Sequence, residues 1–131
     1  MAVSIKSFVV DASFVLSSLL PDEESPSADK YIRRHINGDI ELISSRIFEF
    51  EVFNGFRSAI LKKRITKEDT LRLSEKFLKL GIKYEDADIH EAFLVALKEN
   101  LSVYDASYVY LARLKRISLL TLDSRLKRLA I

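Results

Sequence analysis

The chain has 131 residues, of which 48% are hydrophobic and 31% charged, the balance of a globular protein rather than of a disordered chain. Its length suits one domain that folds without a metal or disulfide, so we expect a single domain over residues 1–131. There is no cysteine, which excludes disulfides, thiolate catalysis and cysteine zinc sites, and the net charge of +2 is too small to indicate a polyanion partner by itself.

The first half of the chain predicts short apolar strands between helices that have clear stops. Pro21 stops the first helix, and Pro26 stands at the first position of the next, where its missing N–H is not needed. In chain order, this half predicts a strand over residues 7–10, a helix ending at Leu20, a helix from Ser25-Pro26 to Gly38, a strand over residues 40–43 and a helix over residues 46–63.

The second half of the chain continues the same alternation. Thr66 and Asp69 are spaced as a capping pair at the start of a helix, and Gly81 ends that helix. In chain order, this half predicts helix 66–80, a weak strand over 82–84, helix 88–100, helix 102–114, strand 117–122 and helix 124–130. Strands that alternate with helices are typical of an α/β fold with a parallel sheet covered on both faces.

The apolar segment near the N-terminus superficially resembles a secretory signal. Lys6 precedes the stretch FVVDASFVLSSLL, but Asp11 interrupts it and no small-residue cleavage site follows. No run approaches the ~18 apolar residues of a membrane span. We therefore read the segment as a buried strand and a helix, and expect a cytoplasmic protein with no membrane partner.

Two aspartates follow predicted strands directly. Asp11 comes after FVV and Asp123 after LLTL, and in parallel sheets binding sites form outside the carboxyl ends of the strands. Each aspartate could instead simply cap the helix that follows it. Asp105, three residues after Ser102, likewise fits a capping box. Position alone leaves the structural and the functional interpretations open.

Glu51 has no such structural explanation. At 100° per residue, the helix over 47–61 is apolar on most sides, with one narrow polar stripe. Burying a carboxylate there without a partner would cost several kcal/mol, although a partly exposed helix edge is the neutral alternative. Glu49 lies in the first turn, where it favourably meets the helix dipole. The stripe comprises Glu51, Asn54 and Ser58, one apolar arc comprises Val52, Phe53, Phe56, Ala59 and Ile60, and a second arc comprises Phe50 and Leu61.

Four segments together resemble a PIN domain of the VapC toxin type, over essentially the whole chain. They are VVDASFVLSSLLPDE, FEFEVFNGF, VYDASYVYLA and LLTLD, in this order and spacing. The resemblance implies a three-layer α/β/α fold with a short central parallel sheet, and a metal-dependent ribonuclease activity. The chain departs from the family at Ser44-Ser45-Arg46, where a proline is common.

The resemblance also implies the site. Four acids match the family's catalytic and metal-binding positions, and three polar residues match positions that support them. The acids are Asp11, Glu51, Asp105 and Asp123, and the supporting residues are Ser13, Asn54 and Thr121. Hydrolysis of a phosphodiester needs an activated water and charge stabilisation, which Mg²⁺ or Mn²⁺ supplies, and these hard cations prefer oxygen ligands. We expect Asn54 to hold Glu51 or a water, and Ser13 and Thr121 to orient water or phosphate oxygens; ordinary capping or turn bonding is the alternative for all three.

The expected partners follow from the same resemblance. They are an RNA substrate, a second copy of the chain bound through helix 46–63 and the next helix, and a cognate antitoxin protein. Basic residues around the site would hold the RNA phosphates, with a solvated helix face as the alternative for each. The candidates are Arg46, Arg57, Lys62, Lys63, Arg113, Lys115 and Arg116. His35 and His90 have no partner at a telling spacing and are read as surface residues.

Other functions fit the sequence less well. A receiver domain would need an adjacent acidic pair and a lysine after the last strand, and a D-x-D phosphatase would need an aspartate where Ser13 stands. A PIN nuclease of RNA maturation and a catalytically silent PIN-like binding module remain as alternatives. The four acids argue against the silent module, and the absence of an added domain favours the toxin.

Overall fold

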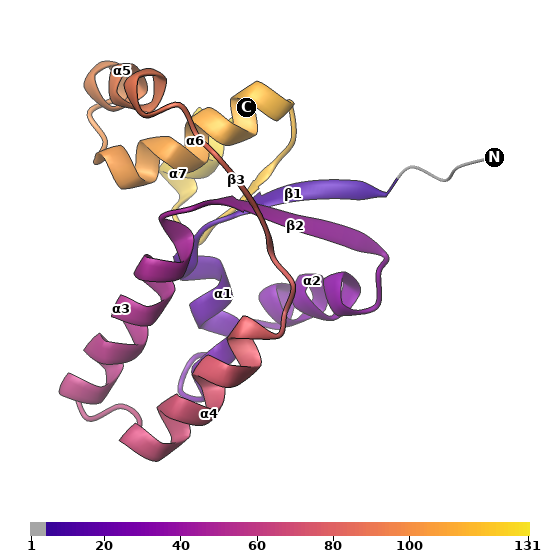
Figure 1. Cartoon of the computed structure of the whole chain (residues 1–131), viewed down its shortest axis with the longest axis vertical. Coiled ribbons are helices and arrows are strands. Elements are labelled where there is room, and N and C mark those ends of the chain that lie inside the picture. The colour runs from indigo at the N-terminus through magenta and orange to yellow at the C-terminus, as the bar shows by residue number, and fades with distance from the viewer. Residues whose placement is uncertain (1–4) are drawn as a thin grey trace.

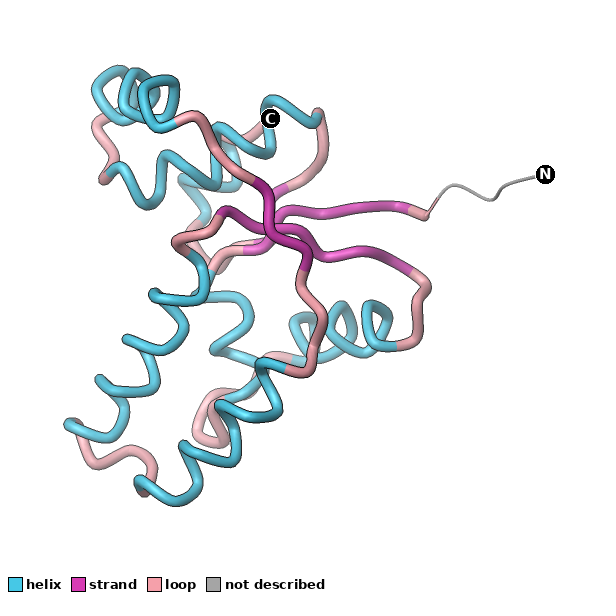
Figure 2. Tube along the Cα trace, in the orientation of Figure 1, coloured by secondary structure: helices cyan, strands magenta, loops and turns pink. Residues whose placement is uncertain are grey.

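The structure is a computed structural model that describes residues 5–131. It confirms the predicted alternation of strands and helices (Figure 1 and Figure 2). The strands are β1 (Lys6–Val10), β2 (Ile40–Ser45), β3 (Lys83–Glu85) and β4 (Leu119–Leu120). The helices are α1 (Ala12–Leu19), α2 (Pro26–Ile36), α3 (Phe48–Leu61), α4 (Lys67–Leu78), α5 (Ile89–Glu99), α6 (Val103–Lys115) and α7 (Ser124–Leu129).

The four described strands form one parallel sheet in the order β3-β2-β1-β4. Helices α1 to α4 lie on one side of this sheet and α5 to α7 on the other, as Figure 1 shows. The three-layer α/β/α prediction is therefore confirmed. Because every strand runs in the same direction, their carboxyl ends meet at one edge, where α1 and α3 begin.

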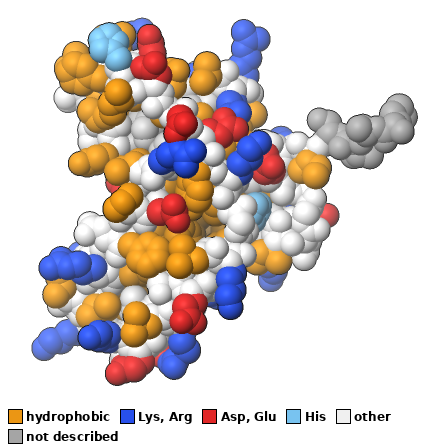
Figure 3. All heavy atoms as spheres, viewed as in Figure 1, with side chains coloured by type: hydrophobic (Ala, Val, Ile, Leu, Met, Phe, Trp, Pro, Cys, Tyr) orange, Lys and Arg blue, Asp and Glu red, His pale blue; other side chains and the backbone are white. Residues whose placement is uncertain are grey.

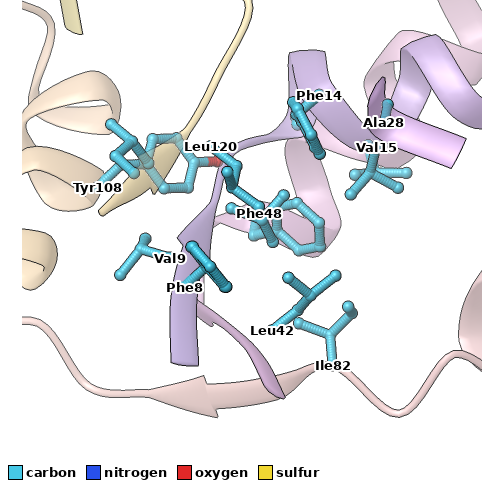
Figure 4. Packing of buried hydrophobic residues seen from close by; sticks show 14 of the residues in the cluster. Phe8, Val9, Phe14, Val15, Ala28, Leu42, Phe48, Ile82, Tyr108 and Leu120 are labelled. Atoms are coloured by element: carbon cyan, nitrogen blue, oxygen red, sulfur yellow. The ribbon is translucent and has the colours of Figure 1, made fainter. Parts of the chain in front are cut away.

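The core consists of the central strands and the helix faces that cover them. Val9, Val10 and Leu42 are fully buried in the sheet, which explains why these strands read as apolar runs. Phe48, at the start of α3, packs against Phe77 of α4 with ring centroids 5.7 Å apart. Figure 4 shows Phe48 among the buried residues around the strands. The ends of β1 and α3 are thus held by packing from several elements.

Strand β2 runs two residues beyond the predicted end at Ile43, since the polar residues that follow have buried partners. Ser44 donates to the carbonyl of Val10 at 2.6 Å, and the hydroxyls of Ser45 and Ser107 lie 2.9 Å apart. Ser44 and Ser45 also pair with β3. Ser44 and Ser45 therefore tie the end of β2 to β1 and α6.

Strand β4 is shorter than predicted. Only Leu119 and Leu120 pair with β1, opposite Val9 and Val10, whereas the apolar pattern predicted a strand over 117–122. The backbone N–H of Leu122 donates instead to the hydroxyl of Ser13 at 3.2 Å. The segment after β4 is thus held by side chains rather than by the sheet.

Several large hydrophobic side chains of α3 and α4 are exposed. Phe50 is 76% exposed and Leu61 63%, and Leu71 and Leu78 of α4 are also exposed. In Figure 3 hydrophobic side chains gather over this pair of helices and also over α5. The second apolar arc predicted for the glutamate helix therefore faces outward. Among residues 5–131, no helix is long and apolar enough to cross a membrane.

Candidate active site

Asp11 lies at the carboxyl end of β1 and is only 5% exposed. Its carboxylate accepts hydrogen bonds from the backbone N–H of Phe14 at 3.1 Å, the hydroxyl of Ser13 at 2.7 Å and the hydroxyl of Thr121. Asp11 therefore caps α1, as the structural interpretation predicted. Burial nevertheless raises the pKa of Asp11, and the charge of Asp105 raises it further, although the three hydrogen bonds oppose this shift.

The segment after β4 is bound to Asp11 through two hydroxyls. The hydroxyls of Ser13 and Thr121 each donate a hydrogen bond to Asp11. The Ser13 hydroxyl also accepts from the backbone N–H of Leu122, and the Thr121 hydroxyl accepts from the backbone N–H of Asp123 at 3.0 Å. The two hydroxyls predicted to support the site thus hold Asp11 and position Asp123.

Asp123 caps the helix that follows it. Its Oδ1 accepts from the backbone N–H groups of Arg125 at 2.9 Å and Leu126 at 3.2 Å. The residue is exposed, and its charge raises the pKa of Asp105. Asp123 therefore combines the predicted capping role with a place beside the other acids.

Glu51 lies in the first turn of α3 and is half-buried. Its Oε1 accepts a hydrogen bond from the hydroxyl of Tyr108 on α6. Burial raises the pKa of Glu51 in spite of that bond, and the charges of Asp105 and Asp11 add to the shift. Burial and the bond to Glu51 in turn raise the pKa of Tyr108, so the phenol keeps its proton and remains a donor.

Asp105 completes the group of four acids. Its backbone N–H donates to the hydroxyl of Ser102 at 3.0 Å, which is half of the predicted capping box. Burial raises the pKa of Asp105, and the charge of Asp123 contributes. The charge of Asp105 thus acts on Asp11 and Glu51, and the charge of Asp123 acts on Asp105, so these four acids lie near one another at the carboxyl edge of the sheet.

Among residues 5–131 the acid cluster has no cationic partner. None of the ion pairs among residues 5–131 includes Asp11, Glu51, Asp105 or Asp123. No three His, Cys, Asp or Glu side chains of the described part of the chain already lie at the distances of a formed metal site. The donors are all carboxylate oxygens, the set that Mg²⁺ and Mn²⁺ prefer. The cluster fits such an ion chemically, and binding would have to draw the carboxylates inward.

Asn54 makes no hydrogen bond to Glu51 among the described residues, and its expected role toward a water stays a prediction. Asn54 is exposed, and its side chain makes no hydrogen bond within residues 5–131. Tyr108 instead donates the hydrogen bond to Glu51, and the sequence analysis did not predict this contact. A usable signal was present, because Tyr108 stands three residues after Asp105 and therefore on the same side of α6.

Three of the predicted RNA-binding cations are already engaged within the protein. Arg46 pairs with Asp86, and Lys115 lies 2.6 Å from Glu85. Arg113 donates to the carbonyl of Leu129 at 2.7 Å and lies 3.7 Å from Glu99. The candidates with no ion pair inside the described range are Arg57, Lys62, Lys63 and Arg116.

A cavity lies away from the four acids. It measures about 780 Å³ and lies beside the amino ends of β1 and β4, with Lys6, Arg116, Leu119 and Lys127 in its lining. None of the four acids lines it. We locate the candidate site by the perturbed carboxylates at the carboxyl edge, since these carry chemistry and an apolar cavity alone does not.

Known proteins resemble this chain along its length. The PIN domain family matches residues 8–131. Ribonuclease VapC3 of Pyrobaculum aerophilum is 33% identical over 122 residues, which are 90% of this chain and 90% of that protein. VapC ribonuclease Mb0985 of Mycobacterium bovis is 30% identical over 119 residues, 90% of this chain and 87% of that protein.

Solved structures share the fold. PAE2754 of Pyrobaculum aerophilum superimposes with a TM-score of 0.74 at 24% identity, covering 95% of this chain and 79% of that one. VapC20 of Mycobacterium tuberculosis, described as a toxin that cleaves the sarcin-ricin loop, gives a TM-score of 0.58 at 13% identity, covering 92% and 93%. Given the family match over residues 8–131 and relatives at 30% identity or more, the chain belongs to the PIN domain family and, within it, to the VapC-type ribonucleases.

Proposed function

We propose that this protein is a Mg²⁺- or Mn²⁺-dependent endoribonuclease and the toxin of a type II toxin–antitoxin pair. The observation that carries the proposal is the cluster of Asp11, Glu51 and Asp105, three carboxylates with raised pKa values and no ion pair in the described part of the chain. Membership among VapC-type ribonucleases supports RNA as the substrate. Carboxylates that repel one another in this way favour the binding of a divalent cation.

The four acids would hold the ion, each from a different element. Asp11, Glu51 and Asp105 offer carboxylates from the end of β1, from α3 and from α6, and Asp123 offers one from the start of α7. When bound, the ion activates a water and stabilises charge on the phosphoryl oxygens. Ser13 and Thr121 fix the orientation of Asp11 and leave no freedom for it to turn away from the cluster.

RNA would be held mainly through its phosphates. The aromatic residues Phe48 and Phe56 of α3 are buried in the core and so are not available to stack on bases. The support for phosphate contact comes from Arg57, Lys62 and Lys63, which lie on and just after α3 and form no ion pair in the described structure. Such contact gives affinity with little reading of base sequence.

The proposal includes the partners and setting expected for a toxin. Exposed Phe50, Phe53 and Leu61 on α3 support a homodimer through this helix and α4; a monomer by light scattering at tens of micromolar would contradict it. A cognate antitoxin, a cytoplasmic location and a single domain over residues 1–131 belong to the same proposal. A short neighbouring gene for a DNA-binding protein would support the antitoxin.

The deciding experiment is an RNA cleavage assay with added Mn²⁺ and with chelator. We expect cleavage that the chelator abolishes and that Asp11→Asn removes, while Asp22→Asn on the surface leaves it intact. Folded wild-type protein that cuts no RNA with metal would instead support the silent binding module. Growth arrest on expression, relieved by the neighbouring gene product, separates a toxin from a nuclease of RNA maturation.

A further inference from the structure

Tyr108 is a buried residue that reaches from one layer of the molecule to the other. It lies on α6 and is 1% exposed, and its hydroxyl donates to Oε1 of Glu51 on α3, 57 positions earlier in the chain. The ring fills core space, as its position in the cluster of buried hydrophobics in Figure 4 shows. Packing explains the ring, but it does not explain why the hydroxyl ends on an acid of the site.

The hydrogen bond from Tyr108 is the sole one that the Glu51 carboxylate accepts within residues 5–131. Asp11, by contrast, accepts three. Glu51 has a longer and more flexible side chain than aspartate, and it is only half-buried. Its orientation therefore depends on one donor, and that donor is rigid, because a tyrosine ring this deeply buried cannot follow the carboxylate toward solvent.

We infer that Tyr108 is a positioning residue for Glu51: it ties Oε1 and leaves Oε2 turned toward the other acids to receive a cation. The inference rests on the proposed metal-dependent function. In this inference Tyr108 acts only through Glu51. Partners that orient a metal-binding side chain in this way typically change metal affinity by 10–100-fold when they are lost.

The test is Tyr108→Phe, which removes one oxygen and keeps the packed ring. Tyr110→Phe and Tyr104→Phe on the same helix are matched controls, since neither hydroxyl forms a hydrogen bond within the described range. We expect calorimetric titration with Mn²⁺ to show about 10–100-fold weaker binding for Tyr108→Phe and no change for the controls. A merely structural hydroxyl would lower the melting temperature and leave Mn²⁺ affinity at the wild-type value, and that result overturns the inference.

A second variant asks whether Tyr108 acts through Glu51. Glu51→Asp shortens the side chain and withdraws the carboxylate from the phenol while keeping its charge. We expect Tyr108→Phe added to Glu51→Asp to weaken Mn²⁺ binding no further; independent losses that multiply would contradict the inference. Wild-type protein that binds no Mn²⁺ would overturn the proposed function together with the inference, whereas wild-type binding that Tyr108→Phe leaves unchanged would overturn the inference alone.

Discussion

Two groups of acids in this molecule have opposite surroundings. Asp22 and Glu23, in the turn after α1, both accept from Arg64: Asp22 through two hydrogen bonds of 2.7 and 2.9 Å, and Glu23 through one of 3.0 Å. The guanidinium lowers the pKa of Asp22. At the carboxyl edge of the sheet, burial and neighbouring charge instead raise the pKa values of Asp11 and Glu51.

In the turn after α1, outside the candidate site, Arg64 neutralises the charges of Asp22 and Glu23. At the sheet edge the chain uses hydroxyls, from Ser13, Thr121 and Tyr108, which orient a carboxylate without cancelling its charge. The negative potential that remains is unfavourable for folding by itself. It becomes useful once a cation from solution enters, so the two groups should respond in opposite ways to mutation, metal and pH.

The largest contrast is expected in RNA cleavage. Glu51→Gln should lower cleavage by about 100-fold or more, the size observed when a group that stabilises developing charge is removed. The matched change Glu23→Gln in the arginine-paired group should leave cleavage unchanged. Rates with saturating Mn²⁺ on one RNA measure both, and equal rates for the two variants would erase the distinction between the groups.

Metal should stabilise the protein only through Asp11, Glu51, Asp105 and Asp123, the acids at the carboxyl edge of the sheet. At a hundredfold excess over Kd, Mn²⁺ should raise the unfolding free energy of the wild type by about 2.7 kcal/mol. The Asp123→Asn variant should gain less stability from Mn²⁺ and should not cleave RNA. In metal-free buffer its stability should equal or exceed that of the wild type, because asparagine caps α7 nearly as well and one repelling charge is gone.

Thermal melts with and without metal measure this response, with Asp22→Asn as the control. An Asp123→Asn variant that still cuts RNA and gains the full metal stabilisation would mean that Asp123 is not a ligand. The proposed four-acid site would then be wrong.

The basic side chains allow the same comparison between groups that form ion pairs and groups that do not. Replacing Arg57, Lys62 or Lys63 with Gln should each reduce the slope of log affinity for RNA against log salt by about one. Arg46→Gln and Lys115→Gln should change it less, because Asp86 and Glu85 already neutralise those side chains. Binding isotherms at several salt concentrations give the slopes, and an affinity independent of salt would rule out recognition through phosphates.

The smallest effect is the pH dependence of stability without metal, and its sign differs between the groups. The folded pKa of Glu51 is raised above its usual 4.5, so the unfolded chain releases this proton first and stability falls as pH rises through that region. The gain in melting temperature from Glu51→Gln should therefore grow above about pH 4.5.

The arginine-paired group should behave in the opposite way. The folded pKa of Asp22 lies below its usual 3.8, so its contribution is present above that pH and is lost as pH falls. Asp22→Asn should lower the melting temperature at neutral pH, and this loss should vanish in acid. Melts in chelator from pH 3 to 7 compare the variants, and parallel curves would show that the two groups have the same surroundings.

Much of the fold follows from the sequence because it depends on local pattern, whereas the four acids were grouped into one site only through the resemblance to PIN domains. The order of residues alone reveals the apolar strands that end at Asp11 and before Asp123, and also the polar stripe that contains Glu51. Tyr108 was not predicted, because only the packing of α6 against the sheet brings its hydroxyl to Glu51 on α3. The pairing of Arg46 with Asp86, 40 positions apart, is likewise invisible before folding.

The hydroxyl of Thr121 joins Asp11 across 110 positions of the chain, and this span has a consequence for how the protein is made. Chains emerge from the ribosome N-terminus first and domains fold as units. Until residues 121–123 have emerged, Asp11 lacks one donor and the acid group lacks Asp123. The contact between Thr121 and Asp11 can therefore form only after nearly the whole domain has been synthesised.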